Sequence, residues 1–136
     1  MSCFADSYAL IAWINGRDAA HARVTGYLAT FQGRLVTTEW VLMEVADALS
    51  ISTHRVAVAD FLRSIRTDSR FDVIGYEQSL YESGFALFTT RQDKDWSLTD
   101  CISFAAMNAR GLRDALTGDR HFTQAGFVAV FGADVQ

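Results

Sequence analysis

The chain has 136 residues, half of them apolar and 21% charged, which is the composition of an ordinary soluble globular domain. No apolar run approaches the roughly 18 residues needed to cross a bilayer, and the N-terminus lacks a signal core, so we expect a cytoplasmic protein without membrane contact. A net charge of −4 argues against nucleic-acid binding through bulk positive charge, although all but one of the 12 basic residues are arginines, which suit phosphate contacts.

Short apolar segments alternate with helical patterns along the whole chain. The first half predicts, in order, a strand at 2–5, a helix ended by Gly16, a helix from an Asp18 cap to about Phe31, a strand at 34–37 and a helix from a Thr38 cap to about Leu49. The second half predicts an amphipathic helix capped by Thr53, a strand at 71–74, a helix over about 77–91, a helix from a Ser97 cap to Gly111, a strand at 114–117, a helical turn at 121–124 and a strand at 127–131. This alternation indicates an α/β fold: a single three-layer domain over 1–136, with a mostly parallel sheet of 4–5 short strands flanked by helices.

Side-chain burial can be predicted from the same patterns. In the helix after Thr53 we expect one apolar face and one basic face, formed by Val56, Phe61, Leu62 and Ile65 and by Arg55, Arg63 and Arg66 respectively. Cys3 and Cys101 lie in apolar stretches, so we expect both to be reduced packing residues.

Three acidic residues fall at the ends of predicted elements. Asp6 follows the first strand, Asp100 lies in the first turn of a helix, and Asp119 follows the strand at 114–117. In open α/β sheets, polar residues beyond the carboxyl ends of the strands usually form the functional site. Carboxylates gathered there from distant parts of the chain would hold a hard divalent cation.

Glu44 is the acid hardest to place. It lies within the apolar run 40–46, which is typical of a buried helix. A carboxylate in that setting must be paired, hydrogen-bonded, metal-bound or protonated. The alternative is a solvated stripe shared with Asp47, which periodicity alone leaves open.

Each of the other acids also has a purely local explanation. Asp6 could cap the helix that follows it, and Asp119 could be a turn residue after Gly118. Asp100 lies three residues after Ser97, the spacing of a capping box. The combination of all these acids favours a shared site over separate structural roles.

The chain resembles the PIN domain family, particularly the VapC-like toxins and their relatives. The resemblance covers essentially the whole chain and lies in the stretches 6–10 (DSYAL), 37–44 (TTEWVLME), 96–104 (WSLTDCISF) and 115–122 (ALTGDRHF). Some members carry a further acid two residues after the fourth one, where this chain has His121, so the number of metal ions is left open. We expect His121 to be a packing residue and leave it out of the site.

The resemblance implies a Mg²⁺- or Mn²⁺-dependent endoribonuclease, a toxin of a toxin–antitoxin pair with RNA as substrate and an antitoxin protein as a possible partner. The implied metal ligands and catalytic residues are Asp6, Glu44, Asp100 and Asp119, with Ser7 and Ser97 orienting carboxylates or water. The chemistry agrees, because oxygen ligands suit Mg²⁺ and Mn²⁺ and no Cys/His set has zinc spacing. We also expect a homodimer, because Phe61, Phe85 and Phe88 add more apolar surface than one small sheet needs to cover.

Other protein classes fit the sequence less well. A haloacid-dehalogenase-type phosphatase needs a second Asp two residues after the first, where this chain has Tyr8. A response-regulator receiver needs an early acid pair and a phosphoacceptor after the third strand, where Gly75 and Tyr76 stand. The serious alternative is a PIN-fold binding or scaffold module without nuclease activity, and the presence of all the acids favours the nuclease.

Overall fold

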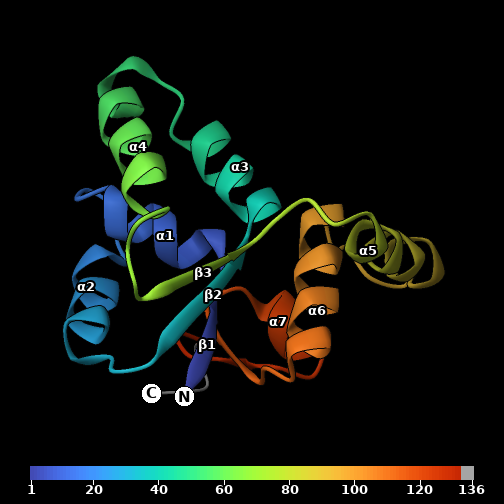
Figure 1. Cartoon of the computed structure of the whole chain (residues 1–136). Coiled ribbons are helices and arrows are strands. Elements are labelled where there is room, and N and C mark those ends of the chain that lie inside the picture. The colour runs from blue at the N-terminus through green and yellow to red at the C-terminus, as the bar shows by residue number, and fades with distance from the viewer. Residues whose placement is uncertain (133–136) are drawn as a thin grey trace.

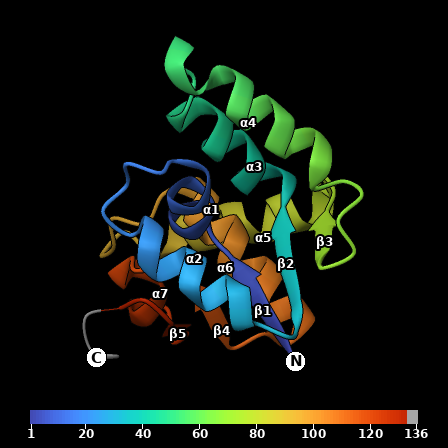
Figure 2. The same cartoon turned by 90° about the vertical axis from the view of Figure 1, so that its left-hand side faces the viewer.

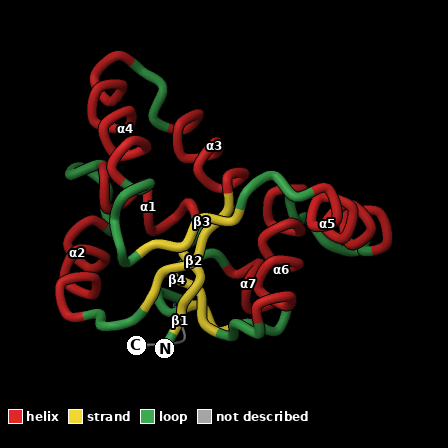
Figure 3. The backbone as a smooth tube through the Cα atoms, viewed as in Figure 1, coloured by secondary structure: helices red, strands yellow, loops and turns green. Residues whose placement is uncertain are grey.

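The computed structural model describes residues 1–132 and contains a five-stranded parallel sheet with helices on both faces (Figure 1, Figure 3). The strands are β1 (Ser2–Ala5), β2 (Arg34–Thr38), β3 (Phe71–Ile74), β4 (Asp114–Leu116) and β5 (Val128–Ala129). The helices are α1 (Ser7–Ile14), α2 (His21–Thr30), α3 (Glu39–Ala48), α4 (Ser52–Ser64), α5 (Gln78–Thr90), α6 (Leu98–Arg110) and α7 (Arg120–Gln124). The predicted α/β architecture is confirmed, although the last strand is shorter than expected. The predicted domain range extends through 133–136, which lie outside the described residues.

The strand order is β3-β2-β1-β4-β5, so β1 lies at the centre of the sheet. Phe4 of β1 is in register with Val36 of β2 on one side and with Ala115 of β4 on the other. The chain adds strands outward from β1 in one direction and then reverses, so the order switches between β1 and β4. Because all strands are parallel, their carboxyl ends meet at one edge, and this switch point is where open α/β sheets usually bind ligands.

The helices form two layers and one projecting pair. In Figure 1, α1 and α2 lie on one side of the sheet, and α5, α6 and α7 lie on the other. Helix α3 leaves directly from the carboxyl end of β2, and Figure 2 shows α3 and α4 side by side, projecting beyond that edge of the sheet. None of the helices within residues 1–132 is long and apolar enough to cross a membrane.

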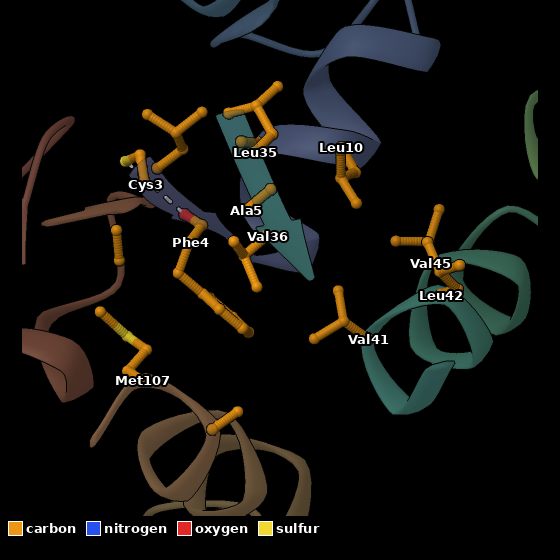
Figure 4. Close-up of a cluster of buried hydrophobic side chains, with 14 of the residues drawn as sticks. Cys3, Phe4, Ala5, Leu10, Leu35, Val36, Val41, Leu42, Val45 and Met107 are labelled. Carbon is orange, nitrogen blue, oxygen red and sulfur yellow. Dashed lines mark hydrogen bonds between the residues drawn. The ribbon is translucent and has the colours of Figure 1, made fainter. Parts of the chain in front are cut away.

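The hydrophobic core is centred on β1, whose buried residues include Phe4 and Ala5 (Figure 4). A second aromatic group fixes the small helix α7 against α6: the rings of Phe104 and Phe122 pack edge to face with centroids 5.0 Å apart. Phe4 also approaches Phe122, at 6.4 Å. Such pairs contribute about 0.5–1.5 kcal/mol beyond the area they bury. Cys3 and Cys101 are buried and free, as predicted.

Helix α6 begins and ends as the sequence predicts. The Ser97 hydroxyl accepts a hydrogen bond from the Asp100 backbone N–H at 3.0 Å, and the Ser97 N–H donates to Asp100 Oδ2 at 3.2 Å, which completes a capping box. Gly111 ends the helix with a φ of 65°, in the left-handed region that favours glycine. Gly84 of α5 lies so close to α6 that a Cβ would meet the Ile102 backbone nitrogen at 2.9 Å, so this close packing requires glycine.

Two predicted helix caps are wrong. Helix α2 begins after Ala20, and Asp18 instead accepts a hydrogen bond from the Ala20 N–H at 2.8 Å within the preceding turn. Helix α4 begins at Ser52 after Ile51, with no side-chain cap, so Thr53 lies inside its first turn. Capping residues also favour turns, so the local pattern does not fix the position at which a helix starts.

The inward face of α4 is also shifted from the prediction. Val56 is 73% exposed, whereas Val58 and Ile65 are buried, with Phe61 and Leu62 partly buried beside them. Val56 lies two positions before Val58, which places it on nearly the opposite side of a helix. The arginines of α4 and of the turn that follows it are exposed, as predicted.

Candidate active site

Asp6 follows β1 at the centre of the sheet and is only 4% exposed. It occupies the N-cap position of α1, but its side chain makes no capping hydrogen bond. Its Oδ2 atom instead accepts a hydrogen bond from the Thr117 hydroxyl at 2.9 Å. The capping explanation for Asp6 is therefore wrong, because the side chain is directed to the neighbouring strand end.

Glu44 projects from α3 and is half-buried. Its Oε1 atom accepts a hydrogen bond of 2.5 Å from the hydroxyl of Ser7, the residue that follows Asp6. Asp47 is exposed, so the two acids do not share a solvated stripe. Ser7 thus connects Glu44 of α3 to the carboxyl end of β1.

Asp100 lies in the first turn of α6 and is 8% exposed. Besides its place in the capping box with Ser97, its Oδ2 atom lies 3.0 Å from Nδ1 of His121. Ser97 orients this carboxylate through its backbone N–H, while its hydroxyl is occupied by the cap. The local role predicted for Asp100 is real, and it coexists with a long-range contact.

Asp119 lies at the N-cap of α7, where its Oδ1 atom accepts a hydrogen bond from the His121 N–H at 2.9 Å. The Asp119 N–H in turn donates to the Thr117 hydroxyl at 3.0 Å. Thr117 therefore holds both Asp6 and Asp119 through one hydroxyl, which donates to the first and accepts from the second. By their order along the chain, we call Asp6 and Glu44 the N-terminal pair and Asp100 and Asp119 the C-terminal pair.

One group of side chains is close enough to share a metal ion. One potential ligand atom from each of Asp100, Asp119 and His121 lies within 4.8 Å of the others. Asp6 and Glu44 are not part of this group, but Asp6 shares the Thr117 hydroxyl with Asp119, and the charges of Asp100 and Asp119 act on Glu44, so both acids lie near it. The available donors are therefore four carboxylates and one imidazole, which fit a divalent cation.

Burial and mutual repulsion perturb the N-terminal pair. The pKa of the Asp6 carboxyl is raised to about 7, chiefly by burial; the Thr117 hydrogen bond lowers it, and the charges of Asp100 and Glu44 add to the rise. Burial also raises the pKa of Glu44, together with the negative charges of Asp100, Asp119 and Asp47, while the Ser7 hydrogen bond lowers it. These mutual effects indicate that the four predicted acids lie close enough for their charges to interact.

The acids have no strong cationic partner within the part of the chain that the structure describes. Among residues 1–132, no lysine or arginine forms a salt bridge with either pair, and the only basic group in contact is His121, 3.0 Å from Asp100 and 3.5 Å from Asp119. Like charges held together without a counter-charge are costly, and such arrangements are found preferentially at functional sites.

Sequence reasoning missed two residues of this arrangement. The sequence pattern predicts only a strand position for Thr117, yet its buried hydroxyl connects Asp6 and Asp119. The prediction that His121 is a packing residue is incomplete, because its ring contacts both acids of the C-terminal pair. The available signal was position: both residues lie within two residues of Asp119, but their partners lie 111 and 21 positions away along the chain.

Comparisons with known proteins agree with this geometry. Residues 3–128 match the model of the PIN domain family. The chain is 30% identical over 128 residues to the 23S rRNA-specific endonuclease VapC20 of Mycobacterium tuberculosis, covering 93% of this chain and 96% of the relative.

Solved structures share the fold. The crystal structure of M. tuberculosis VapC20, described as a sarcin–ricin loop cleaving toxin, matches with a TM-score of 0.86 and 25% identity over 93% of this chain and 96% of that one. VapBC2 from Rickettsia felis, bound to a DNA fragment from its promoter, matches with a TM-score of 0.67 and 15% identity over 95% and 97% of the two chains. The family match spans nearly all of the described residues and all four predicted acids, and the chain therefore belongs to the PIN domain family.

Proposed function

We propose that this protein is a Mg²⁺- or Mn²⁺-dependent endoribonuclease and the toxin of a toxin–antitoxin pair. The observation that carries the proposal is the convergence of Asp6, Glu44, Asp100 and Asp119 at the switch point of the sheet, with raised pKa values in the N-terminal pair and no lysine or arginine paired with them among residues 1–132. A divalent cation is the counter-charge that such a donor set fits.

The residues around the acids fix where the carboxylates point. Thr117 holds Asp6, Ser7 holds Glu44, and the Ser97 backbone holds Asp100. When bound, Mg²⁺ or Mn²⁺ makes water more acidic and offsets charge on the phosphate oxygens. The contribution of the protein is orientation: each carboxylate is fixed by a donor, so the site is organised before RNA arrives.

The choice of RNA as substrate is supported by the relative that cleaves 23S rRNA and matches over 93% of this chain. Ribosomal RNA is therefore the first substrate to test. The toxin role is supported by the VapC20 structure described as a toxin. An antitoxin protein is the partner that this role requires.

The test is cleavage of purified ribosomal RNA by the purified protein, with Mg²⁺ or Mn²⁺ and with excess EDTA. We expect cleavage only with the metal ion, and loss of cleavage in the Asp6→Asn variant. The matched control is Asp60→Asn, which alters an exposed carboxylate of α4 that pairs with Arg63. Robust cleavage in EDTA that Asp6→Asn retains would reject the proposal, and a folded protein inert with every RNA and metal would favour a binding module.

A homodimer is the second part of the proposal. Phe85 and Phe88 of α5 are 46% and 44% exposed, and Tyr81 stacks on Phe85 at 6.1 Å, so α5 presents an apolar surface. Phe61 does not belong to such a surface, because its ring packs edge to face on Trp13 at 5.9 Å. Light scattering at micromolar concentration should give the mass of a dimer, and a strictly monomeric mass would contradict this part.

A further inference from the structure

His121 lies inside the acidic site but has no role in a mechanism that uses carboxylates alone. Its Nδ1 atom is 3.0 Å from Asp100 Oδ2 and 3.5 Å from Asp119 Oδ1. The tightest potential metal-binding group within residues 1–132 consists of these three side chains and excludes Asp6 and Glu44. The imidazole thus lies within contact distance of both acids of the C-terminal pair.

The position of His121 is fixed from both sides of α7. The backbone N–H of His121 donates a hydrogen bond to Asp119 Oδ1 at 2.9 Å, and the next residue, Phe122, is fully buried against Phe104. At the other end of α7, Gln124 accepts a hydrogen bond from the Trp96 indole N–H at 3.0 Å, which ties the helix to the loop before α6. These contacts hold the ring beside Asp100.

The two acids retain oxygen atoms for a ligand. The hydrogen bonds formed by described side chains and backbone use Oδ2 of Asp100 and Oδ1 of Asp119. The other carboxylate oxygen of each residue accepts no hydrogen bond from residues 1–132. Because one ligand atom from each of Asp100, Asp119 and His121 lies within 4.8 Å of the others, one nitrogen and two oxygens are close enough to bind a common ion.

We infer that His121 is a nitrogen ligand in this site and that it gives the protein a preference for Mn²⁺ over Mg²⁺. The inference rests on the proposed function only in placing a divalent cation among the same carboxylates. Mg²⁺ is a hard ion that prefers oxygen ligands and retains its waters. Imidazole favours first-row transition metal ions, and Mn²⁺ is the one that also accepts carboxylates and water readily.

The decisive measurement is pulsed electron paramagnetic resonance on the full-length protein loaded with Mn²⁺. A directly bound imidazole produces nitrogen hyperfine coupling, and labelling histidine with the heavy nitrogen isotope should change it. The chain has 3 histidines, and the other two lie elsewhere: His21 contacts the Ala12 carbonyl, and His54 lies in α4. We expect the coupling in the wild type, its loss in His121→Asn, and its retention in the matched control His54→Asn.

Binding constants give a second measurement. Loss of a residue that only orients a ligand weakens metal binding about 10–100-fold, so His121→Asn should weaken Mn²⁺ binding at least about tenfold. Mg²⁺ binding should change much less. In His121→Asp, which restores an all-oxygen donor set, the ratio of the two dissociation constants should move toward Mg²⁺. Calorimetry on each variant, with a melting curve to confirm folding, provides these values.

The outcomes separate this inference from the proposed function. Mn²⁺ binding without nitrogen coupling in the wild type would overturn the inference and assign His121 to a hydrogen bond with Asp100, while metal-dependent RNA cleavage could still stand. Nitrogen coupling in a protein that cleaves no RNA would support the inference and reject the nuclease. Absence of any Mn²⁺ binding would reject the inference directly.

Discussion

The N-terminal and C-terminal acid pairs reach the same edge of the sheet by different physical routes. Asp6 and Glu44 are held by hydroxyl groups from other elements, and burial raises their pKa values. Asp100 and Asp119 each accept a hydrogen bond from a backbone N–H at the start of a helix, so they also stabilise local structure. The comparison teaches that one site can combine acids that weaken the fold with acids that support it. Substitutions in each pair should therefore change the stability in opposite directions.

The largest expected effect is a gain of stability in Asp6→Asn without metal. The folded-state pKa of Asp6 is about 7 against an ordinary value of 3.8, so between these values the unfolded chain loses a proton that the folded chain keeps. The free energy of unfolding therefore falls as the pH rises from about 4 to about 7 and stays low above that range. Because Asp6 is buried, the loss reaches up to about 4 kcal/mol, and the variant should recover most of it.

Urea denaturation in EDTA at about pH 4 and about pH 8 checks this prediction. The free energy of unfolding of Asp6→Asn should equal that of the wild type at the lower pH and exceed it at the higher pH. The exposed-site variant Asp60→Asn should show no such difference. A loss of stability in Asp6→Asn at the higher pH would contradict this difference, because Asp6 would then support the fold as the C-terminal pair does.

A smaller effect, of opposite sign, is expected in Thr117→Val. This substitution preserves the shape of a fully buried side chain but removes the hydroxyl between Asp6 and Asp119. Oδ2 of Asp6 then loses its donor, and the Asp119 N–H loses its acceptor. Leaving such groups without partners lowers the free energy of unfolding by about 2 kcal/mol. The cost should grow with pH, since the Thr117 hydrogen bond lowers the pKa of Asp6 and its loss makes ionisation harder.

The control for this prediction is Thr117→Ser, which retains the hydroxyl. Its free energy of unfolding should stay closer to the wild type than that of the valine variant at every pH. Equal losses in both variants would assign the effect to packing of the methyl group instead.

The smallest effect on stability is expected in Asp100→Asn. Loss of the charged member of the capping box should cost about 1 kcal/mol in EDTA, where Asp6→Asn gains stability. If Asp100 is also a metal ligand, the variant loses most of the stabilisation that saturating Mn²⁺ or Mg²⁺ gives to the folded state. Thermal melts of both proteins with and without metal provide the comparison, and a full metal shift in the variant would make Asp100 a cap alone.

The local features of the fold could be predicted from the sequence. Hydrophobic periodicity gave the order and approximate bounds of the strands and helices, and the Ser97 capping box and the Gly111 helix end are as predicted. The Thr38 cap is also confirmed, because its hydroxyl accepts from the Val41 N–H at 3.1 Å. These features depend on interactions within a few residues, which a single sequence displays directly.

The same kind of reasoning gave the wrong caps at Asp18 and Thr53 and the wrong orientation for Val56. Asp18 forms a turn where a cap was expected, and the inward face of α4 was set by which residues meet the rest of the core. Packing outweighs such local preferences, because helix stability in proteins comes mainly from the face that is buried.

Only the tertiary structure decided how the acids are held. Asp6, Glu44, Asp100 and Asp119 were identified from their positions in the sequence, but no local pattern indicated that one hydroxyl, that of Thr117, would serve both Asp6 and Asp119. His121 likewise joins the C-terminal pair because α7 packs on α6, which brings residues 21 positions apart into contact. Chain order determines which groups are available, whereas long-range packing determines which of them meet.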